Sequence, residues 1–208
     1  MLLWAHITSG ALALLCGALA LVFKKGSVAH RRSGQVFFVS MLLCGTSALW
    51  MAIRTHHAFL LVIGVFSLYL TLAGFNALRV LKSDSARKFG HGLSAVMALG
   101  IAAFLYIAVR SLQQGNPAGA TVLLVFAAVA GFLVWQDHTV LRSRTPQGPI
   151  TLHIGRMVGA WISAFTAFLV VNGTMQPPIL NWLLPTVIGV PVIVFWIGKK
   201  TAGSPRHR

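Results

Sequence analysis

Acidic residues are nearly absent from this chain: its 208 residues include 2 Asp and Glu against 17 Lys and Arg. Charged residues of both signs make up only 9% of the sequence, whereas a soluble domain carries about a quarter. Hydrophobic residues reach 57%, and the mean hydropathy is +0.81. This composition excludes an ordinary soluble domain and indicates an integral membrane protein in contact with the lipid bilayer.

The motifs of common hydrolases are also missing. The sequence has no G-x-S-x-G turn, no H-E-x-x-H pair and no paired carboxylates. Proton-coupled and cation transport use carboxylates within the membrane, and neither Asp84 nor Asp137 falls in the middle of an apolar run. The net charge of +15 does not predict a nucleic-acid partner, because the basic residues do not lie on a soluble module with interleaved aromatic residues.

Apolar runs long enough to cross a bilayer, about 20 residues each, recur along the chain. They lie at residues 2–23, 36–53, 58–80, 92–112, 118–141, 154–173 and 181–198. The connectors between them are too short to hold a soluble domain. The sequence therefore predicts an all-α, polytopic membrane bundle of seven transmembrane helices in a single domain, residues 1–200, followed by a short basic tail, residues 201–208.

The basic residues predict the orientation of the bundle. Apart from Arg54 and Arg110, every Lys and Arg falls in or beside the first, third and fifth connectors or in the tail. Because basic loops stay in the cytoplasm, we expect the N-terminus outside, the C-terminus in the cytoplasm and the protein in the bacterial inner membrane. The first run is expected to be a retained helix rather than a secretory signal, because Lys24 and Lys25 follow it instead of preceding it.

Histidines are common for so apolar a chain, which has 8 of them. Apart from His207 in the tail, they fall near predicted helix ends and form two layers. The outer layer holds His6, His56 and His57, and the inner layer holds His30, His91, His138 and His153.

Small residues recur at helical spacing next to His6, His91 and His153. Such stripes serve close helix packing and would also leave room for a flat ring beside an imidazole. Asp137 directly precedes His138. Its carboxylate is expected either to orient a ligating imidazole or to pair with Arg142 or Arg144 at the end of its own helix.

Two segments, "GSVAHRRSGQVF" after the first run and "HIGRMVGAWISAFTAFLVVN" in the sixth, carry a resemblance. In them the chain resembles a family of bacterial predicted multi-pass membrane proteins whose domain has no known function. The resemblance implies a helical membrane fold and no particular activity. The motif residues that it implies are His6, His30, Arg32, Gly34, His153, Arg156 and Met157. The two layers of histidines are also reminiscent, in architecture alone, of b-type membrane cytochromes.

The leading functional prediction is a redox protein that binds b-type haem through histidine pairs. At the outer layer the expected pair is His6 with His57, with His56 in reserve. At the inner layer it is His91 with His153, with His138 as the alternative partner. Arg156 is expected to contact a haem propionate or a lipid headgroup. Electrons would pass between the layers, to a quinone or to a redox partner, as in an oxidoreductase or electron-transfer protein.

Two alternatives stay open. An inner cluster is able to bind a divalent metal, Zn or Cu, because imidazole suits both ions; its ligands would be His30, His91, His138 and His153, with Asp137 in support. The other alternative is a non-catalytic membrane sensor or assembly factor, in which the histidines only cap helices.

Overall fold

The structure, a computed structural model, describes residues 1–143, 147–173 and 175–202. This part of the chain is helical throughout, apart from short turns, and each helix is long and apolar enough to span a membrane. The seven helices are α1 (Leu2–Val22), α2 (Val28–Arg54), α3 (Ala58–Ala77), α4 (Asp84–Gln113), α5 (Pro117–Ser143), α6 (Gln147–Asn172) and α7 (Ile179–Ala202). The predicted fold class and helix number are confirmed. Most of the predicted tail, residues 203–208, lies outside the described residues.

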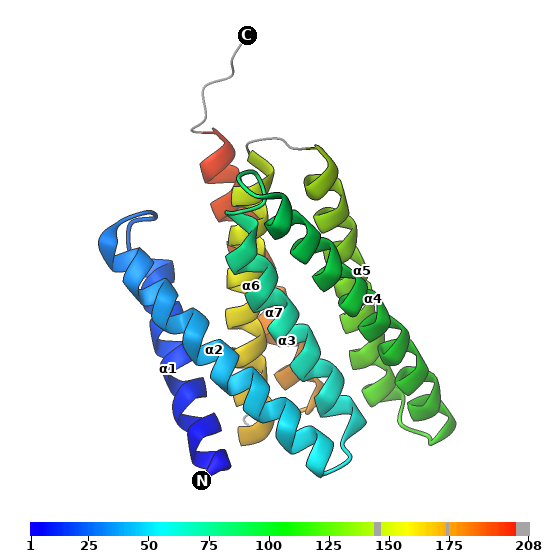
Figure 1. Cartoon of the computed structure of the whole chain (residues 1–208). Coiled ribbons are helices and arrows are strands. Elements are labelled where there is room, and N and C mark those ends of the chain that lie inside the picture. Colours follow the sequence, from blue (N-terminus) through cyan, green and yellow to red (C-terminus); the bar gives the residue numbers. More distant parts are fainter. Residues whose placement is uncertain (144–146, 174, 203–208) are drawn as a thin grey trace.

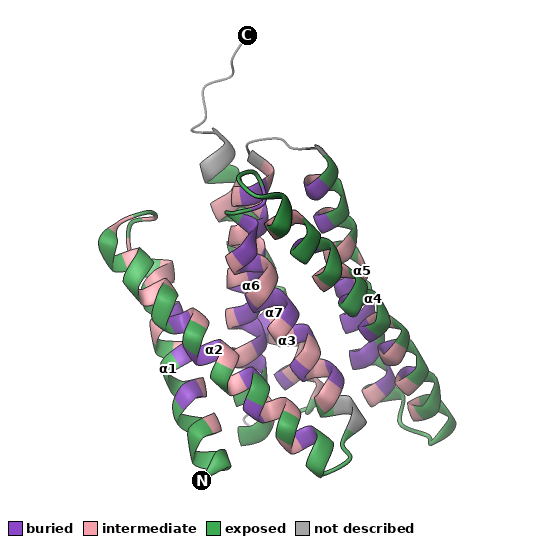
Figure 2. Ribbon diagram, in the orientation of Figure 1, coloured by how far each residue is buried: buried purple, intermediate pink, exposed green. Residues whose placement is uncertain are grey.

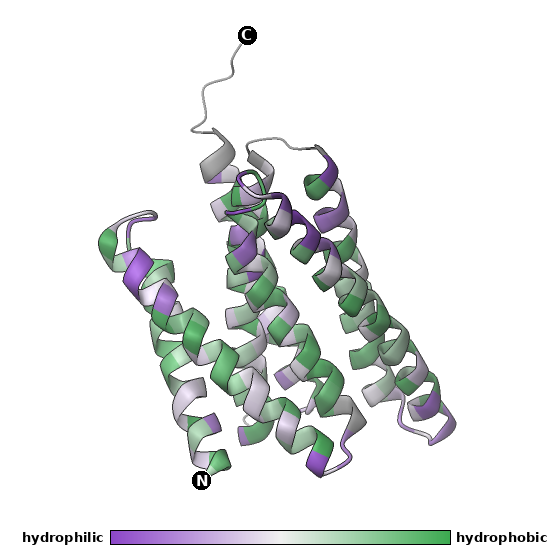
Figure 3. Cartoon of the chain, in the orientation of Figure 1, coloured by the Kyte–Doolittle hydropathy of each residue, from purple (hydrophilic) through white to green (hydrophobic). Residues whose placement is uncertain are grey.

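The helices form two hairpins around a central group (Figure 1). The α1–α2 hairpin lies at one side and the α4–α5 hairpin at the other, while α3, α6 and α7 lie between them. The N-terminus is at one end of the bundle; the α1–α2 and α3–α4 connections lie at the opposite end (Figure 1). Hydrophilic residues gather at the two ends and hydrophobic ones along the helix bodies, as a membrane-spanning bundle requires (Figure 3).

Buried residues concentrate on the central helices and on the faces that the hairpins turn toward them (Figure 2). Aromatic side chains fill part of this core. The ring of Phe66 on α3 meets those of Phe104 and Phe126 edge to face, with centroids 6.3 and 5.4 Å apart. On the other side, Trp161 of α6 donates from Nε1 to the carbonyl of Leu14 at 2.9 Å and so ties the central group to α1.

Three helices begin about two turns earlier than the apolar runs predict. The helices α2, α4 and α6 start at Val28, Asp84 and Gln147 rather than at residues 36, 92 and 154. Serine caps explain two of these starts, because a serine hydroxyl satisfies a free backbone N–H in the first turn. Ser27 accepts from the backbone N–H of His30, and Ser83 accepts from that of Ala86.

The early starts change where the inner histidines lie. The sequence places three of them, His30, His91 and His153, before or at the start of their helices, and His138 at the end of its helix. In the structure His30 is in the first turn of α2, while His91 and His153 are about two turns inside α4 and α6. Each helix therefore presents its histidine from a regular segment, which fixes the direction of the side chain.

Candidate functional site

A buried guanidinium lies where the central helices meet the α4–α5 hairpin. Arg156 on α6 is only 1% exposed. Its Nη2 donates to Asp137 Oδ1 at 2.6 Å and to the carbonyl of Leu133 at 2.7 Å. Its Nη1 donates to Gln136 Oε1 at 3.1 Å. Among the described residues, none accepts a hydrogen bond from Arg156 Nε.

The carboxylate of Asp137 extends this network to α3 and α4. Tyr69 on α3 donates its phenolic O–H to Asp137 Oδ2. The hydroxyl of Ser94 on α4 donates to the same oxygen at 3.4 Å. The network therefore joins α3, α4, α5 and α6. An isolated charge is costly in a membrane, so the mutual neutralisation of Arg156 and Asp137 explains how both are buried.

The pairing of Asp137 corrects the sequence prediction. Asp137 was expected to pair with Arg142 or Arg144, or to orient His138. Its carboxylate instead binds Arg156 on the neighbouring helix, while Arg142 is exposed; Arg144 lies outside the described residues. Successive residues of a helix point about 100° apart, so Asp137 faces the interior while His138 is exposed.

The pairing of Arg156 with Asp137 also affects the contact predicted for Arg156. To contact a haem propionate or a lipid headgroup, the guanidinium would have to reach the membrane–water boundary. Arg156 is buried, and both of its terminal nitrogens already donate to α5. The sequence held a signal for this pair, since Asp137 is the only acid inside an apolar run and Arg156 the base just inside another.

Three histidines share one hydrogen-bonding arrangement. In each, ring nitrogen Nδ1 lies within hydrogen-bonding distance of a backbone carbonyl. His6 meets Cys44 O on α2 at 3.1 Å, His30 meets Ala20 O on α1 at 3.0 Å, and His153 meets Gly74 O on α3 at 2.9 Å.

These contacts fix the tautomer of the three imidazoles. A carbonyl oxygen only accepts, so Nδ1 must carry the proton, and in the neutral ring Nε2 is left with a free lone pair. An Nδ1–H bonded to a carbonyl is the usual support of a histidine that binds a metal through Nε2. In this tautomer His6, His30 and His153 could each bind a ligand through Nε2.

His30 on α2 and His153 on α6 both lie toward the inner end of the bundle, where the α1–α2 connection is found (Figure 1). Both side chains are partly buried. The sequence places these two residues together only in the predicted Zn or Cu cluster, and it gives His30 no haem partner.

His91 and His138 form an inner pair, between α4 and α5. Their ring centroids are 6.4 Å apart in an edge-to-face arrangement, and both residues are exposed. His91 therefore meets the alternative partner, His138, rather than His153. The pairing of His91 with His153 as haem ligands stays a prediction. His30 shares with His153 an Nδ1 that is held by a backbone carbonyl.

The outer histidines are turned to different neighbours. His6 faces α2, where its Nδ1 also lies 3.1 Å from Ser47 Oγ. His57 caps α3, and its Nδ1 accepts from the backbone N–H of Leu60 at 3.5 Å, which places the ring proton on Nε2. His56 is exposed, with a backbone φ of 51°. His57 would have to release its cap to become a ligand through Nε2.

The residues of the proposed Zn or Cu site are not assembled. Within the part of the chain that the structure describes, no group of three or more His, Cys, Asp or Glu side chains is placed to hold a metal ion. Structural zinc sites need four ligands, and the carboxylate of Asp137 is already held by Arg156 and Tyr69.

A lysine lies beside His30, just beyond the C-terminal end of α1. Lys25 Nζ donates to Ala20 O at 3.0 Å and to Leu21 O at 2.5 Å. The first of these carbonyls is the one that holds His30. The ammonium group also lies 4.2 Å from the centre of the Trp196 ring on α7. Burial lowers the pKa of Lys25 from its ordinary value, and a cation at a helix C-terminus is favourable.

The fold and this network define a multi-pass helical membrane protein with buried charges and anchored histidines. Residues 3–105, just under half of the chain, match the family model described as "Predicted membrane protein (DUF2306)", a domain of unknown function. The match contains His6, His30, Arg32 and Gly34 of the implied motif. No curated protein and no solved structure matches the chain.

Proposed function

We propose that this protein binds b-type haem at the inner end of the bundle, that His30 and His153 would hold it, and that the protein transfers electrons within the membrane. One observation carries the proposal: two histidines toward the inner end of the bundle, on different helices, each have Nδ1 held by a backbone carbonyl. Haem requires only two such imidazoles, whereas a zinc site requires a larger cluster.

The surroundings of the two histidines suit a haem group. Propionates are anionic, and Lys25, Arg31 and Arg32 lie within a few residues of His30. These bases replace Arg156 as the expected propionate contacts. Bound haem would supply one-electron chemistry, and a quinone in the bilayer or a redox partner protein would exchange electrons with it. The chain's own residues would hold the imidazoles in one tautomer and exclude water.

For its orientation, we propose that the N-terminus lies outside and the C-terminus in the cytoplasm of the inner membrane. The basic α1–α2 and α3–α4 connections lie at the same end of the bundle (Figure 1), and basic loops favour the cytoplasm. His30 and His153 would then lie at the cytoplasmic boundary, within reach of soluble donors and acceptors.

The test is the visible spectrum of protein purified after expression with haem available. We expect a Soret band that His30→Ala and His153→Ala each weaken strongly. His138→Ala is the matched control, because its ring is exposed and pairs with His91, and it should retain the band. Elemental analysis belongs in the same experiment.

Two outcomes would overturn the proposal. Folded protein without a Soret band that takes up no added haem would leave the sensor or assembly-factor alternative. Stoichiometric Zn or Cu in colourless protein would favour a metal site, and the exposed His91–His138 pair would be the first place to look for it.

A further inference from the structure

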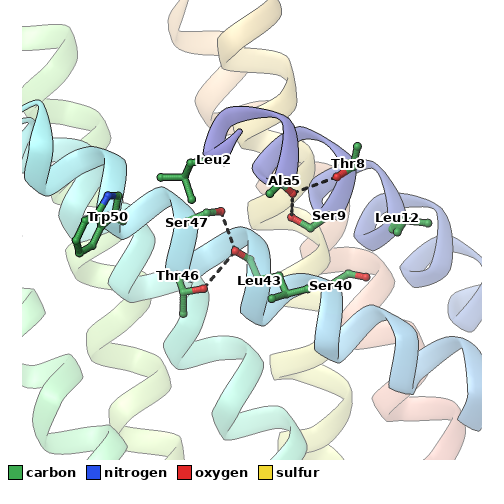
Figure 4. A pocket seen from close by; sticks show the side chains of 10 residues that line it. All are labelled: Leu2, Ala5, Thr8, Ser9, Leu12, Ser40, Leu43, Thr46, Ser47 and Trp50. Atoms are coloured by element: carbon green, nitrogen blue, oxygen red, sulfur yellow. Dashed lines mark hydrogen bonds between the residues drawn. The ribbon is translucent and has the colours of Figure 1, made fainter.

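A groove runs between α1 and α2 in the half of the hairpin that contains the N-terminus (Figure 4). Its cavity volume is about 420 Å³, which is in the usual range of ligand-binding pockets. Both helices that form it are membrane-spanning segments. Its rim includes exposed apolar side chains, among them Leu12, Leu43 and Trp50, so the groove opens toward the surrounding lipid rather than into the bundle.

Five hydroxyl side chains line this groove, Thr8, Ser9, Ser40, Thr46 and Ser47, and all but Ser40 donate to carbonyls of their own helices. Thr8 donates to Trp4 O at 2.9 Å and Ser9 to Ala5 O at 2.7 Å. On α2, Thr46 and Ser47 donate in the same way to the carbonyls of Leu42 and Leu43, each at 2.7 Å. Figure 4 shows these side chains turned back onto their own helices. The groove therefore offers no hydroxyl donor from these residues and suits a hydrocarbon chain.

A positive charge lies at one end of the groove. The guanidinium carbon of Arg54 is 5.2 Å from the centre of the ring of Trp50, which lines the groove. Tryptophan and arginine together are typical of the membrane–water boundary, where an anionic headgroup meets both. Arg54 and Arg110 are the only basic residues that do not fall in or beside the three basic connectors or the tail. Both are therefore expected on the side of the membrane opposite the basic loops.

We propose that this groove binds an anionic phospholipid, with one acyl chain between α1 and α2 and the phosphate at Arg54. A second copy of the protein fits less well. Helices that pack in membranes need small residues at the rim to approach closely, whereas Leu43 and Trp50 stand out from this rim and are 59% and 54% exposed.

The experiment is native mass spectrometry of the full-length protein from mixed micelles that contain phosphatidylglycerol or phosphatidylcholine. Wild-type protein should retain phosphatidylglycerol in preference to phosphatidylcholine. Thr8→Phe should abolish the retained lipid, because its ring would occupy the groove. Thr121→Phe is the matched control, because Thr121 is also exposed and also donates to the carbonyl four residues earlier, but on α5.

The charge is tested separately. Arg54→Gln should lower the preference for phosphatidylglycerol about fivefold, the effect of one basic residue at a membrane surface. Arg110→Gln, the corresponding change at the last turn of α4, should leave the preference unchanged. Both arginines are exposed, so neither change threatens folding.

Several results would overturn the proposal. One is equal retention of the two lipids by wild-type protein; another is wild-type retention by Thr8→Phe. Dimers that Thr8→Phe disrupts, without any retained lipid, would show that the occupant is a second copy. Because Arg54 and Thr8 lie at the opposite end of the bundle from His30 and His153, the haem spectrum should be unaltered in each variant.

Discussion

Arg156 on α6 and Asp137 on α5 form an ion pair with 2.6 Å between Nη2 and Oδ1, and their side chains are only 1% and 6% exposed. The other ion pair in the described residues, Arg87 with Asp84, lies at the start of α4, where the Asp84 side chain is 82% exposed. Of the two acids of the chain, Asp137 is thus buried and Asp84 is exposed. A substitution of Asp84 therefore serves as the control for the same substitution of Asp137.

Removing the charge of Asp137 should destabilise the protein strongly. Asp137→Asn leaves the guanidinium of Arg156 buried without a counter-charge, which costs about 3–5 kcal/mol. Asp84→Asn removes an exposed pair and should cost about 1 kcal/mol or less. Thermal unfolding of the two variants in one detergent makes the comparison. A third variant, Asp137→Leu with Arg156→Met, should recover much of the loss; equal stability of the two single variants would contradict the assignment.

Tyr69 should contribute through its hydroxyl group alone. Tyr69→Phe keeps the ring in the core but removes the hydrogen bond to the Asp137 carboxylate. A hydrogen bond to a charged group contributes about 1.5–3 kcal/mol. Tyr106→Phe removes the only other tyrosine hydroxyl of the sequence, from a residue that is 65% exposed, and should be neutral in the same unfolding assay. A neutral Tyr69→Phe would mean that Asp137 does not depend on this donor.

The sequence predicts the helices of this fold far better than the contacts between them. Hydropathy locates each membrane-spanning run, because the bilayer selects for about 20 apolar residues. It does not locate the starts of α2 and α4, which Ser27 and Ser83 set by capping polar first turns. A periodic pattern places a residue on a helix face, but which helix that face meets depends on the packing of the whole bundle.

The histidines illustrate the same limit. Their two layers follow from the sequence, because depth in the membrane depends only on position along a helix. Their partners do not. His153 binds the carbonyl of Gly74, where glycine allows α6 to come close; a Cβ there would lie 2.8 Å from Met157 Sδ. No pattern in the sequence identifies that carbonyl as the partner, since every residue of the chain carries an identical one.

Close approach between α1 and α6 should be sensitive to a single methyl group. A Cβ at Gly17 would lie 3.0 Å from Phe37 Cδ2 and would overlap the indole ring of Trp161. The ring cannot turn away without losing its bond to Leu14 O. Gly17→Ala should therefore cost about 1–3 kcal/mol from overpacking. Gly92→Ala, on an exposed part of α4 with no atom within 4 Å of the new Cβ, should be neutral or slightly stabilising.

The outcome for Gly17 is measured by thermal unfolding beside Gly92→Ala. If both variants unfold at the wild-type temperature, then α1 and α6 do not pack as closely as the bond from Trp161 to Leu14 implies. A loss in Gly92→Ala alone would instead show that the exposed face of α4 is covered by another molecule.

The proposed orientation predicts which end of α4 faces the cytoplasm. Lys82 and Gln114 are exposed residues just beyond the two ends of this helix. In a background with Cys16 and Cys44 replaced by Ala, Gln114→Cys should react with a membrane-impermeant maleimide in intact spheroplasts. Lys82→Cys should react only after the membrane is opened, because the basic α3–α4 connection keeps the N-terminal end of α4 on the cytoplasmic side. The reverse labelling pattern would place His30 and His153 on the outer side, and the haem would then exchange electrons with partners outside the cell membrane rather than in the cytoplasm.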